Sequence, residues 1–379
     1  MLKPLLTTTD PQNYDAYFNE KIDMVKNLFI KAGLDIPQEK LFKSPPEFYR
    51  MRAEFSVFHE NDGSVSFVMF KPKTDPKERI IIKSFPIASK AINMGMDLLR
   101  KYLPQYPELK RKLFEAEFLC NQKGELISSL SYHRPLDETL WKEAALDLKE
   151  KCKSEGLEVN FVGRARKQTI LASTDTVLET IHTKDKDFYL YQVEGNFSQP
   201  NIYTCQKMID FARNLCQNRK RVDLLELYCG SGTFTICLAD LFSKALATEV
   251  SRIPTATAIR NIAKNNISNT KIVRLSAVEV AQALTGVRKF NRLRQEDVNI
   301  QNYNFDTLLI DPPRKGLEFQ EARDFTAQFD HVIYVSCGPE SLVEDLKYLT
   351  KTHKIEKLAF FDQFPYTPHL ESIVELCKK

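Results

Sequence analysis

One cysteine stands where a thiol could act as a nucleophile. Cys337 follows the apolar run 331–336 and is itself followed by Gly338 and Pro339. Ligands of open parallel α/β sheets bind at the carboxyl ends of the strands. The helix expected over 340–349 would also place its N-terminus beside the thiol and lower the thiol pKa. An isolated cysteine is more often a buried structural residue, but this position favours a reactive one.

A glycine-rich turn upstream has the composition of a cofactor loop. The run 222–227 is typical of a buried strand and leads into Cys-Gly-Ser-Gly at 229–232. A dinucleotide fingerprint would need Gly or Ala three residues after Gly232, where Thr235 stands. Glu249, at the end of the next expected strand, has the spacing of a residue that holds ribose hydroxyls. An ordinary tight turn is the alternative, but Glu249 favours a cofactor without pyrophosphate, such as S-adenosylmethionine.

A third strand end carries Asp311, two prolines and Arg314. The prolines rigidify the exit from the strand expected over 305–310 and remove backbone donors, as they would in a plain strand-ending turn. Methyltransferases that modify exocyclic amines prefer an aromatic residue after the prolines. Arg314 instead offers a bidentate fork for a phosphate or a base edge, which argues against amine methylation.

A thiolate beside a methyl donor suits methylation of a pyrimidine ring. Addition of sulfur to carbon 6 makes carbon 5 a nucleophile for the methyl group, and a base must then remove the hydrogen at carbon 5. Cytosine methylation on RNA commonly uses a second cysteine in the proline loop, and 311–316 has none. Glu371 is the candidate base, although the same residue would be unremarkable on a surface strand.

The elements that must position these residues fall into two parts. At 379 residues the chain exceeds the usual size of a single core. After residue 201 helices alternate with apolar strands, which predicts a parallel α/β sheet. We therefore predict a Rossmann-like domain over 191–379 and an α+β, RNA-binding domain over 1–190. Within 1–190 we expect helices over about 10–33, 87–102 and 137–156, hairpins turning at 61–63 and 121–124, and antiparallel strands within 159–192.

Two arginines of the first domain are candidates for contact with RNA. In the strand that opens the hairpin at 49–70, apolar residues alternate from Met51 to Val57 and leave Arg50 and Arg52 on the opposite face. A solvated strand face is the alternative. The formal net charge is only +4, so a polyanion must be met by local patches. The other basic clusters, at 164–167, 219–221 and 288–294, are short and typical of solvated surface.

Composition narrows the class of protein further. The chain is 43% apolar and 27% charged, as in ordinary globular proteins, and its apolar runs are too short to span a membrane. Residues 1–4 show no signal-peptide pattern, so we expect a cytoplasmic protein. The eight cysteines include no Cys-x-x-Cys pair and the six histidines no metal spacing, so we expect free thiols and neither metal nor iron–sulfur cluster.

These motifs resemble those of the RNA 5-methyluridine methyltransferase family over essentially the whole chain. The resemblance implies that Cys337 is the nucleophile and Glu371 the proton acceptor. The matching segments are 197–201, 225–232, 311–314, 336–339 and 369–371, with 48–55 and 132–137 similar to the branch that acts on tRNA. The candidate cofactor-binding residues are Gln199, Tyr228, Gly230, Gly232, Thr233, Glu249 and Asp311. The candidate RNA-binding residues are Arg50, Arg52, His133 and Arg314.

Two residues depart from the family pattern. Thr233 and Gly338 each stand where the family usually has Asn, which affects local contacts to the cofactor and the thiol. The ribosomal-RNA branch with an iron–sulfur cluster has clustered N-terminal cysteines, whereas here that region offers only Cys120 and Cys152.

The resemblance implies 5-methyluridine formation in the T-loop of tRNA, with the target base flipped into a pocket that contains Cys337 and Glu371. We expect a monomer whose partner is the tRNA T-arm, with other hairpins of T-loop-like fold as further substrates, and no membrane. One alternative is a methyltransferase for cytosine or for a different uracil. Another is a non-catalytic module that binds or folds RNA.

Overall fold

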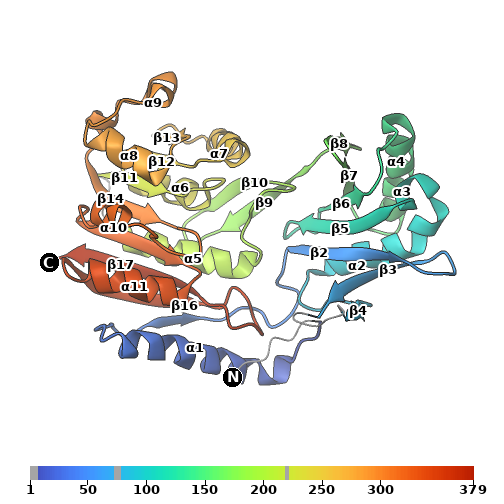
Figure 1. The fold of residues 1–379 in the computed structure, drawn as a ribbon, viewed down its shortest axis with the longest axis horizontal. Helices are drawn as coiled ribbons and strands as arrows, with labels where there is room; N and C mark the ends of the chain where they lie inside the picture. The colour runs from blue at the N-terminus through green and yellow to red at the C-terminus, as the bar shows by residue number, and fades with distance from the viewer. Residues whose placement is uncertain (1–6, 72–77, 218–221) are drawn as a thin grey trace.

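The computed structural model describes residues 7–71, 78–217 and 222–379, so the N-terminal residues 1–6 and the basic cluster at 219–221 lie outside it. The described strands form an eight-stranded sheet, a seven-stranded sheet and a two-stranded ribbon. Figure 1 shows the two large sheets as separate lobes with the ribbon between them. We call them the eight-stranded lobe and the seven-stranded lobe.

The eight-stranded sheet is the α/β sheet that the sequence predicts, and all of its strands but β17 are parallel. Its strand order is β1-β16-β17-β15-β14-β11-β12-β13, and β17 runs antiparallel to both of its neighbours. The first residue of β17 therefore lies at the same edge of the sheet as the last residues of the parallel strands. The strands are β1 (Lys40–Phe42), β11 (Asp223–Leu227), β12 (Ala245–Thr248), β13 (Thr270–Val273), β14 (Phe305–Ile310), β15 (His331–Ser336), β16 (His353–Phe361) and β17 (Glu371–Lys378).

Helices cover both faces of this sheet (Figure 1). On one face α1 (Tyr14–Lys31) and α11 (Pro339–Leu349) pack with Val332 and Val374. On the other face α5 (Ile202–Leu215) and α6 (Thr233–Leu238) pack with Ile333 and Ile373. The other helices of this lobe are α7 (Arg252–Lys264), α8 (Ala277–Leu284), α9 (Asn291–Gln295) and α10 (Gln320–Thr326).

The first described helix and strand, α1 and β1, belong to the eight-stranded lobe rather than to the lobe that follows them in the sequence. The expected first helix is confirmed as α1, whose apolar side chains Phe18, Ile22, Val25 and Phe29 are buried. Strand β1 pairs in parallel with β16. A domain boundary near residue 190 stays a prediction. These contacts show that α1 and β1, which precede that boundary, lie with a sheet formed mainly by residues after it.

The seven-stranded lobe has the order β4-β3-β2-β5-β6-β7-β8. Both expected hairpins are confirmed, as β2–β3 and β5–β6. β7 is antiparallel to β8 but parallel to β6, because the helix α4 (Glu138–Ser154) crosses over between them. The other elements are β2 (Arg52–His59), β3 (Val65–Phe70), β4 (Arg79–Ile81), α2 (Lys90–Tyr102), α3 (Pro107–Lys110), β5 (Leu113–Cys120), β6 (Leu126–Tyr132), β7 (Val159–Ala165) and β8 (Gln168–Leu171).

The ribbon consists of β9 (Thr176–His182) and β10 (Asp187–Val193), which pair antiparallel. Its backbone is held to α7 by two asparagines: the amide N–H groups of Tyr189 and Tyr191 donate to the side-chain oxygens of Asn265 and Asn261 at 2.8 and 2.7 Å. The ribbon is thus attached to the eight-stranded lobe. None of the described helices is both long and apolar enough to cross a membrane.

Candidate active site

Five strand ends of the eight-stranded lobe open into one cleft of about 600 Å³, a size typical of cofactor and substrate sites. Cys337 follows β15 and Glu371 begins β17, and the neighbouring residues Ser336 and Ser372 pair directly across the two strands. The expected nucleophile and base are therefore adjacent. The cleft is also lined by Gln199, Tyr228, Gly230, Glu249, Asp311 and Arg314.

Two carboxyl groups at the base of the cleft have raised pKa values. Burial raises the pKa of Glu371 to about 8; the nearby Asp311 adds to this shift and Arg314 opposes it. Burial raises the pKa of Asp311 to about 7. Removing these groups from water disfavours their charged forms. A cation placed beside them would restore the charged forms, so the cleft favours a positively charged ligand.

The Cys337 thiol does not have the lowered pKa that the sequence suggested. The side chain is half-buried, and burial, with Glu371 and Asp311, raises the pKa to about 11, while Arg314 opposes the shift. The expected effect of the α11 N-terminus is outweighed. Part of the reason is Pro339, which occupies the first turn of the helix and has no N–H to offer the thiolate.

The glycine-rich turn brings its backbone and an acidic side chain together. Tyr228, Gly230 and Gly232 all have positive φ angles, of 62°, 53° and 81°, which glycine adopts without strain. The Gly230 N–H donates to Glu249 Oε2 at 3.2 Å, and the Ser251 N–H donates to Oε1 at 2.8 Å. Glu249 is thus fixed beside the turn, at the end of β12, as its spacing in the sequence predicts.

A buried residue that the sequence did not reveal orients Gln199. The side chain of Gln363 is fully buried, and its Nε2 donates to Gln199 Oε1 at 2.7 Å. Gln199 also lines the cleft, and its amide nitrogen takes no part in this hydrogen bond. The preceding Asp362 is anchored by a buried ion pair with Lys21 of α1. The only sequence signal was a polar pair directly after the apolar strand β16.

Gly338 allows two loops of the cleft to touch. A Cβ atom at this position would lie 2.5 Å from the carbonyl oxygen of Arg314 and 2.8 Å from Ser341 Oγ. The same hydroxyl donates to that carbonyl at 2.7 Å. A larger residue would force the proline loop away from the nucleophile loop, so glycine at 338 has a structural explanation.

A family comparison agrees with this geometry. The sequence model of the tRNA (Uracil-5-)-methyltransferase family matches residues 13–379. The chain belongs to this family. The predicted resemblance is therefore confirmed, and with it the enzyme class, an S-adenosylmethionine-dependent RNA uracil C5-methyltransferase.

Relatives and solved structures agree with the family assignment. Proteins named tRNA/tmRNA (uracil-C(5))-methyltransferase from Vibrio parahaemolyticus and Photobacterium profundum are 40% and 41% identical, over 98% of this chain and 98% and 99% of theirs. The Pyrococcus abyssi tRNA (uracil-54, C5)-methyltransferase, solved with S-adenosyl-L-homocysteine, is similar with a TM-score of 0.67 at 19% identity, over 96% of this chain and 83% of that one. This similarity confirms the predicted fold.

Two of the residues expected from the family motifs lie behind the cleft. Gly232 packs against α7, because a Cβ there would be 3.3 Å from Ala258. Thr233, which stands where the family usually has Asn, lines a small neighbouring pocket together with Gln199 and Phe197. Their expected roles as cofactor contacts remain predictions.

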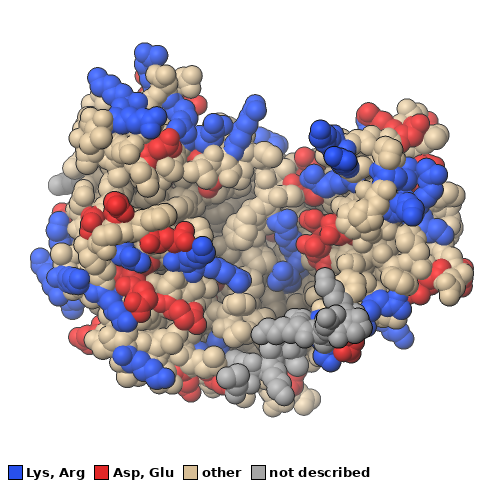
Figure 2. Space-filling view, viewed as in Figure 1, with Lys and Arg blue, Asp and Glu red and all other residues tan. Residues whose placement is uncertain are grey.

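The expected RNA-binding residues of the seven-stranded lobe are already engaged within the protein. Arg50 Nε donates to the carbonyl of Arg52 at 2.7 Å, and Arg52 contacts the Asn196 carbonyl and lies 3.7 Å from Glu117. The exposed ring of His133 stacks on Phe114 with the ring centres 3.8 Å apart. Figure 2 shows a hollow between the lobes with basic and acidic side chains along its walls.

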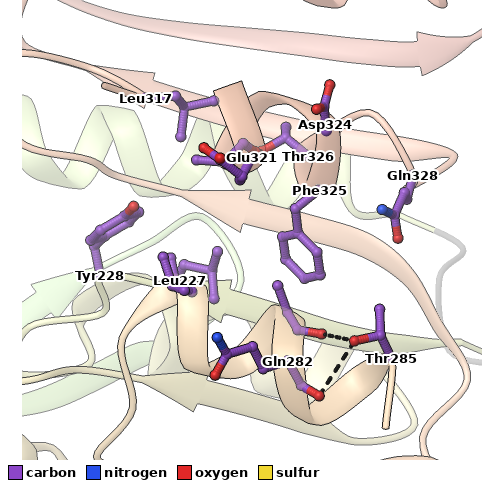
Figure 3. Close-up of a pocket in the computed structure, with 14 residues that line it drawn as sticks. Leu227, Tyr228, Gln282, Thr285, Leu317, Glu321, Asp324, Phe325, Thr326 and Gln328 are labelled. Carbon is purple, nitrogen blue, oxygen red and sulfur yellow. Dashed lines mark hydrogen bonds between the residues drawn. The ribbon is translucent and has the colours of Figure 1, made fainter. Parts of the chain in front are cut away.

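A second cavity, of about 300 Å³, lies between α8 and α10 (Figure 3). It shares Tyr228 and Ala277 with the active-site cleft, and its other walls include the apolar side chains of Leu317 and Phe325. It contains none of the predicted catalytic residues. Sequence reasoning did not anticipate it because its walls come from separate segments.

Proposed function

We propose that this chain methylates carbon 5 of the uracil at position 54 in the T-loop of tRNA, through a transient bond between Cys337 and carbon 6. The observation that carries the proposal is the meeting of Cys337, Glu371 and the Glu249 turn in one cleft. The names of the curated relatives and of the Pyrococcus enzyme support the substrate.

The residues of the cleft fit S-adenosylmethionine. Its sulfonium is a cation, which suits a site where the half-buried Asp311 and the buried Glu371 have raised pKa values. Glu249 would accept hydrogen bonds from the ribose hydroxyls of the cofactor. The rest of the cofactor would be held by Gln199, Tyr228 and Gly230. Bound there, the cofactor supplies the methyl group and places a positive charge that lowers the pKa of the nearby thiol.

Cys337 and Glu371 would act at opposite ends of the reaction. The Cys337 thiol would lose its proton to solvent, and its sulfur would bond to carbon 6 of uracil. Carbon 5 then gains the electrons that form the bond to the methyl carbon, as the bond between that carbon and the sulfonium sulfur breaks. Glu371, with a pKa of about 8, is partly ionised near neutral pH and suited to accept the proton from carbon 5. The electrons of that C–H bond then re-form the ring double bond and expel the sulfur.

Among the described residues that line the cleft, Cys337 is the only cysteine. This composition supports uracil rather than cytosine as the base, because the second thiol common in RNA cytosine methylation is missing there. The expectations of a monomer and of activity on other T-loop-like hairpins belong to this same proposal.

The deciding experiment uses tRNA transcribed without modifications and a methyl donor labelled on the methyl group. We expect 5-methyluridine by nucleoside mass spectrometry, mapped to position 54, with one label per tRNA. A transcript with cytosine at position 54 should remain unlabelled. Label in 5-methylcytidine, or at another uridine, would contradict the proposed substrate, and binding of tRNA without any label would favour a non-catalytic RNA-binding module.

A further inference from the structure

Three side chains of metal-ligand type meet at the end of β15 and β17 that lies away from the active site. His331 is the first residue of β15, Cys377 is its direct partner in β17, and Glu375 lies two residues earlier on the same face. One ligand atom of each lies within 4.8 Å of the others. At about 3.3 Å per residue, β15 separates this group from Cys337 by ~20 Å.

The hydrogen bonds of His331 determine which of its ring nitrogens can bind a cation. Thr307 Oγ1 donates its only hydrogen to Asp306 Oδ1 at 2.9 Å and therefore must accept from His331 Nδ1, 3.0 Å away. The hydrogen of a neutral His331 ring is thus on Nδ1. Metal-binding histidines commonly donate a hydrogen bond from the ring nitrogen that does not bind the ion.

The other ring nitrogen faces a carboxylate. His331 Nε2 lies 2.9 Å from Glu375 Oε1, and both atoms present lone pairs to each other when the hydrogen of the ring is on Nδ1. A cation has to lie between them, either a proton or a metal ion. Lys357, 3.3 Å from Glu375 Oε2, occupies the other oxygen and leaves Oε1 to that cation.

We propose that His331 Nε2, Glu375 Oε1 and the Cys377 thiolate bind one divalent zinc ion, with water as the fourth ligand. Nitrogen, carboxylate oxygen and sulfur are the ligands that Zn²⁺ takes in proteins. Bonds of about 2.0–2.2 Å at a tetrahedral angle would place Nε2 and Oε1 ~3.4 Å apart, so they need to separate only slightly. On binding, the proton between them and the thiol proton pass to solvent.

The ion would be structural rather than catalytic. It would join the first residue of β15 to the end of β17, and these two strands carry Cys337 and Glu371 at their other ends. Sequence spacing did not reveal the group, because one ligand comes from a distant strand and the other two are i and i+2 on a single strand. The proposal is independent of the base that the enzyme methylates.

The test uses the full chain, treated with a chelator, dialysed, and titrated with Co²⁺ as a spectroscopic substitute for Zn²⁺. We expect one equivalent of Co²⁺ to produce a thiolate-to-metal charge-transfer band that Zn²⁺ abolishes. Cys377→Ala should lose the band and bind the ion at least tenfold more weakly. This variant alters a half-buried residue one position before the end of β17, so it should fold.

Cys337→Ala is the matched control, because Cys337 is the other half-buried cysteine; it should keep the band. Zn²⁺ should also raise the melting temperature of the wild type and leave that of Cys377→Ala unchanged, since an ion bound only by the folded state stabilises it. Absence of the band in the wild type, its persistence in Cys377→Ala, or its loss in Cys337→Ala would each overturn the proposal.

Discussion

The active-site cleft and the arginine pair of the seven-stranded lobe use charge in opposite ways. In the cleft, burial dominates the surroundings of Asp311 and Glu371 and raises the pKa of both carboxyl groups. Arg50 and Arg52 instead donate to neighbouring carbonyl groups of the protein. Guanidinium groups that already donate to carbonyl groups have fewer donors left for RNA, whereas carboxyl groups with raised pKa values gain charge when a cationic ligand binds beside them. Substitutions in the cleft should therefore have the larger effects on function.

The largest effect is expected at Cys337. Cys337→Ala removes the nucleophile and should lower the methylation rate by about 10⁴-fold or more. In Glu371→Gln, methyl transfer should proceed and then stall, leaving an RNA–protein species that survives denaturing electrophoresis and disappears when Cys337→Ala is added. RNA containing 5-fluorouridine should trap the wild type in the same way, because fluorine cannot leave as a cation.

The matched control for the nucleophile is Cys377→Ala, a change at the other half-buried cysteine, which should retain methylation. An adduct that persists without Cys337, or the absence of an adduct under both trapping conditions, would show that the assigned mechanism is wrong.

The second prediction concerns stability and pH. The folded-state pKa of Glu371, about 8, lies above the ordinary value of 4.5, so the folded state binds the proton more tightly than the unfolded state does. Glu371 therefore costs progressively more stability as pH rises from about 4.5 to about 8. Glu371→Gln should raise the free energy of unfolding by about 3 kcal/mol at pH 7 and by little at pH 4.

Urea unfolding of wild type and Glu371→Gln at several pH values measures this difference. Glu296→Gln, at an exposed site, is the control and should leave the pH dependence unchanged. If the difference in the free energy of unfolding between wild type and Glu371→Gln does not grow with pH, burial does not keep the Glu371 carboxyl group protonated. The contrast between the cleft and the arginine pair would then be wrong.

Glu249→Ala should raise the KM for the methyl donor about 30-fold and leave the KM for tRNA nearly unchanged. Two backbone N–H groups hold this carboxylate at the cleft, and loss of a hydrogen bond to a charged group costs about 2 kcal/mol. Calorimetry with S-adenosylhomocysteine gives the same comparison without turnover. Wild-type affinity in the variant would mean that the acidic residue has been misassigned.

Gln363→Glu should weaken cofactor binding about tenfold, although residue 363 lies outside the cleft lining. A carboxylate at 363 cannot donate to Gln199, so the Gln199 amide would turn to donate in its place and present its oxygen to the cleft. The affinity for S-adenosylhomocysteine reports the orientation of the Gln199 amide, and the melting temperature reports any effect of the substitution on folding. Wild-type affinity in Gln363→Glu would mean that Gln363 only fills space in the core. Gln295→Glu, the same change at an exposed residue, is the matched control.

The smallest effect is expected when Arg50 and Arg52 are both changed to Ala. Their guanidinium groups already have partners within the protein, so tRNA binding should weaken only a few-fold. The slope of the logarithm of the affinity against the logarithm of the salt concentration should fall by less than about 2. Filter binding across a salt titration measures both. If affinity and slope are both unchanged, the two arginines do not contact RNA. If the tRNA affinity falls much further, the arginine pair matters as much as the cleft, and the contrast between these two regions is wrong.

The sequence predicted the positions at the strand ends well because their signals are local. Cys337, Asp311 and the Glu249 turn each follow an apolar run, and parallel strands bring such ends to one edge. The direction of the Cys337 pKa shift was predicted wrongly, because burial raises the pKa of the thiol and the two carboxyl groups that add to this shift come from other strand ends. Gln363 and the His331 group were missed for the same reason: their partners lie far away in the sequence.

The helix α1 and the strand β1 pack with elements that lie more than 300 residues later in the sequence. β1, at Lys40–Phe42, can pair only after β16, at His353–Phe361, has left the ribosome, and α1 likewise waits for α11. The strands of the seven-stranded lobe, by contrast, all pair within residues 52–171. During synthesis this lobe can fold first, while the eight-stranded sheet is complete only after β17, the strand that begins at Glu371, has been made.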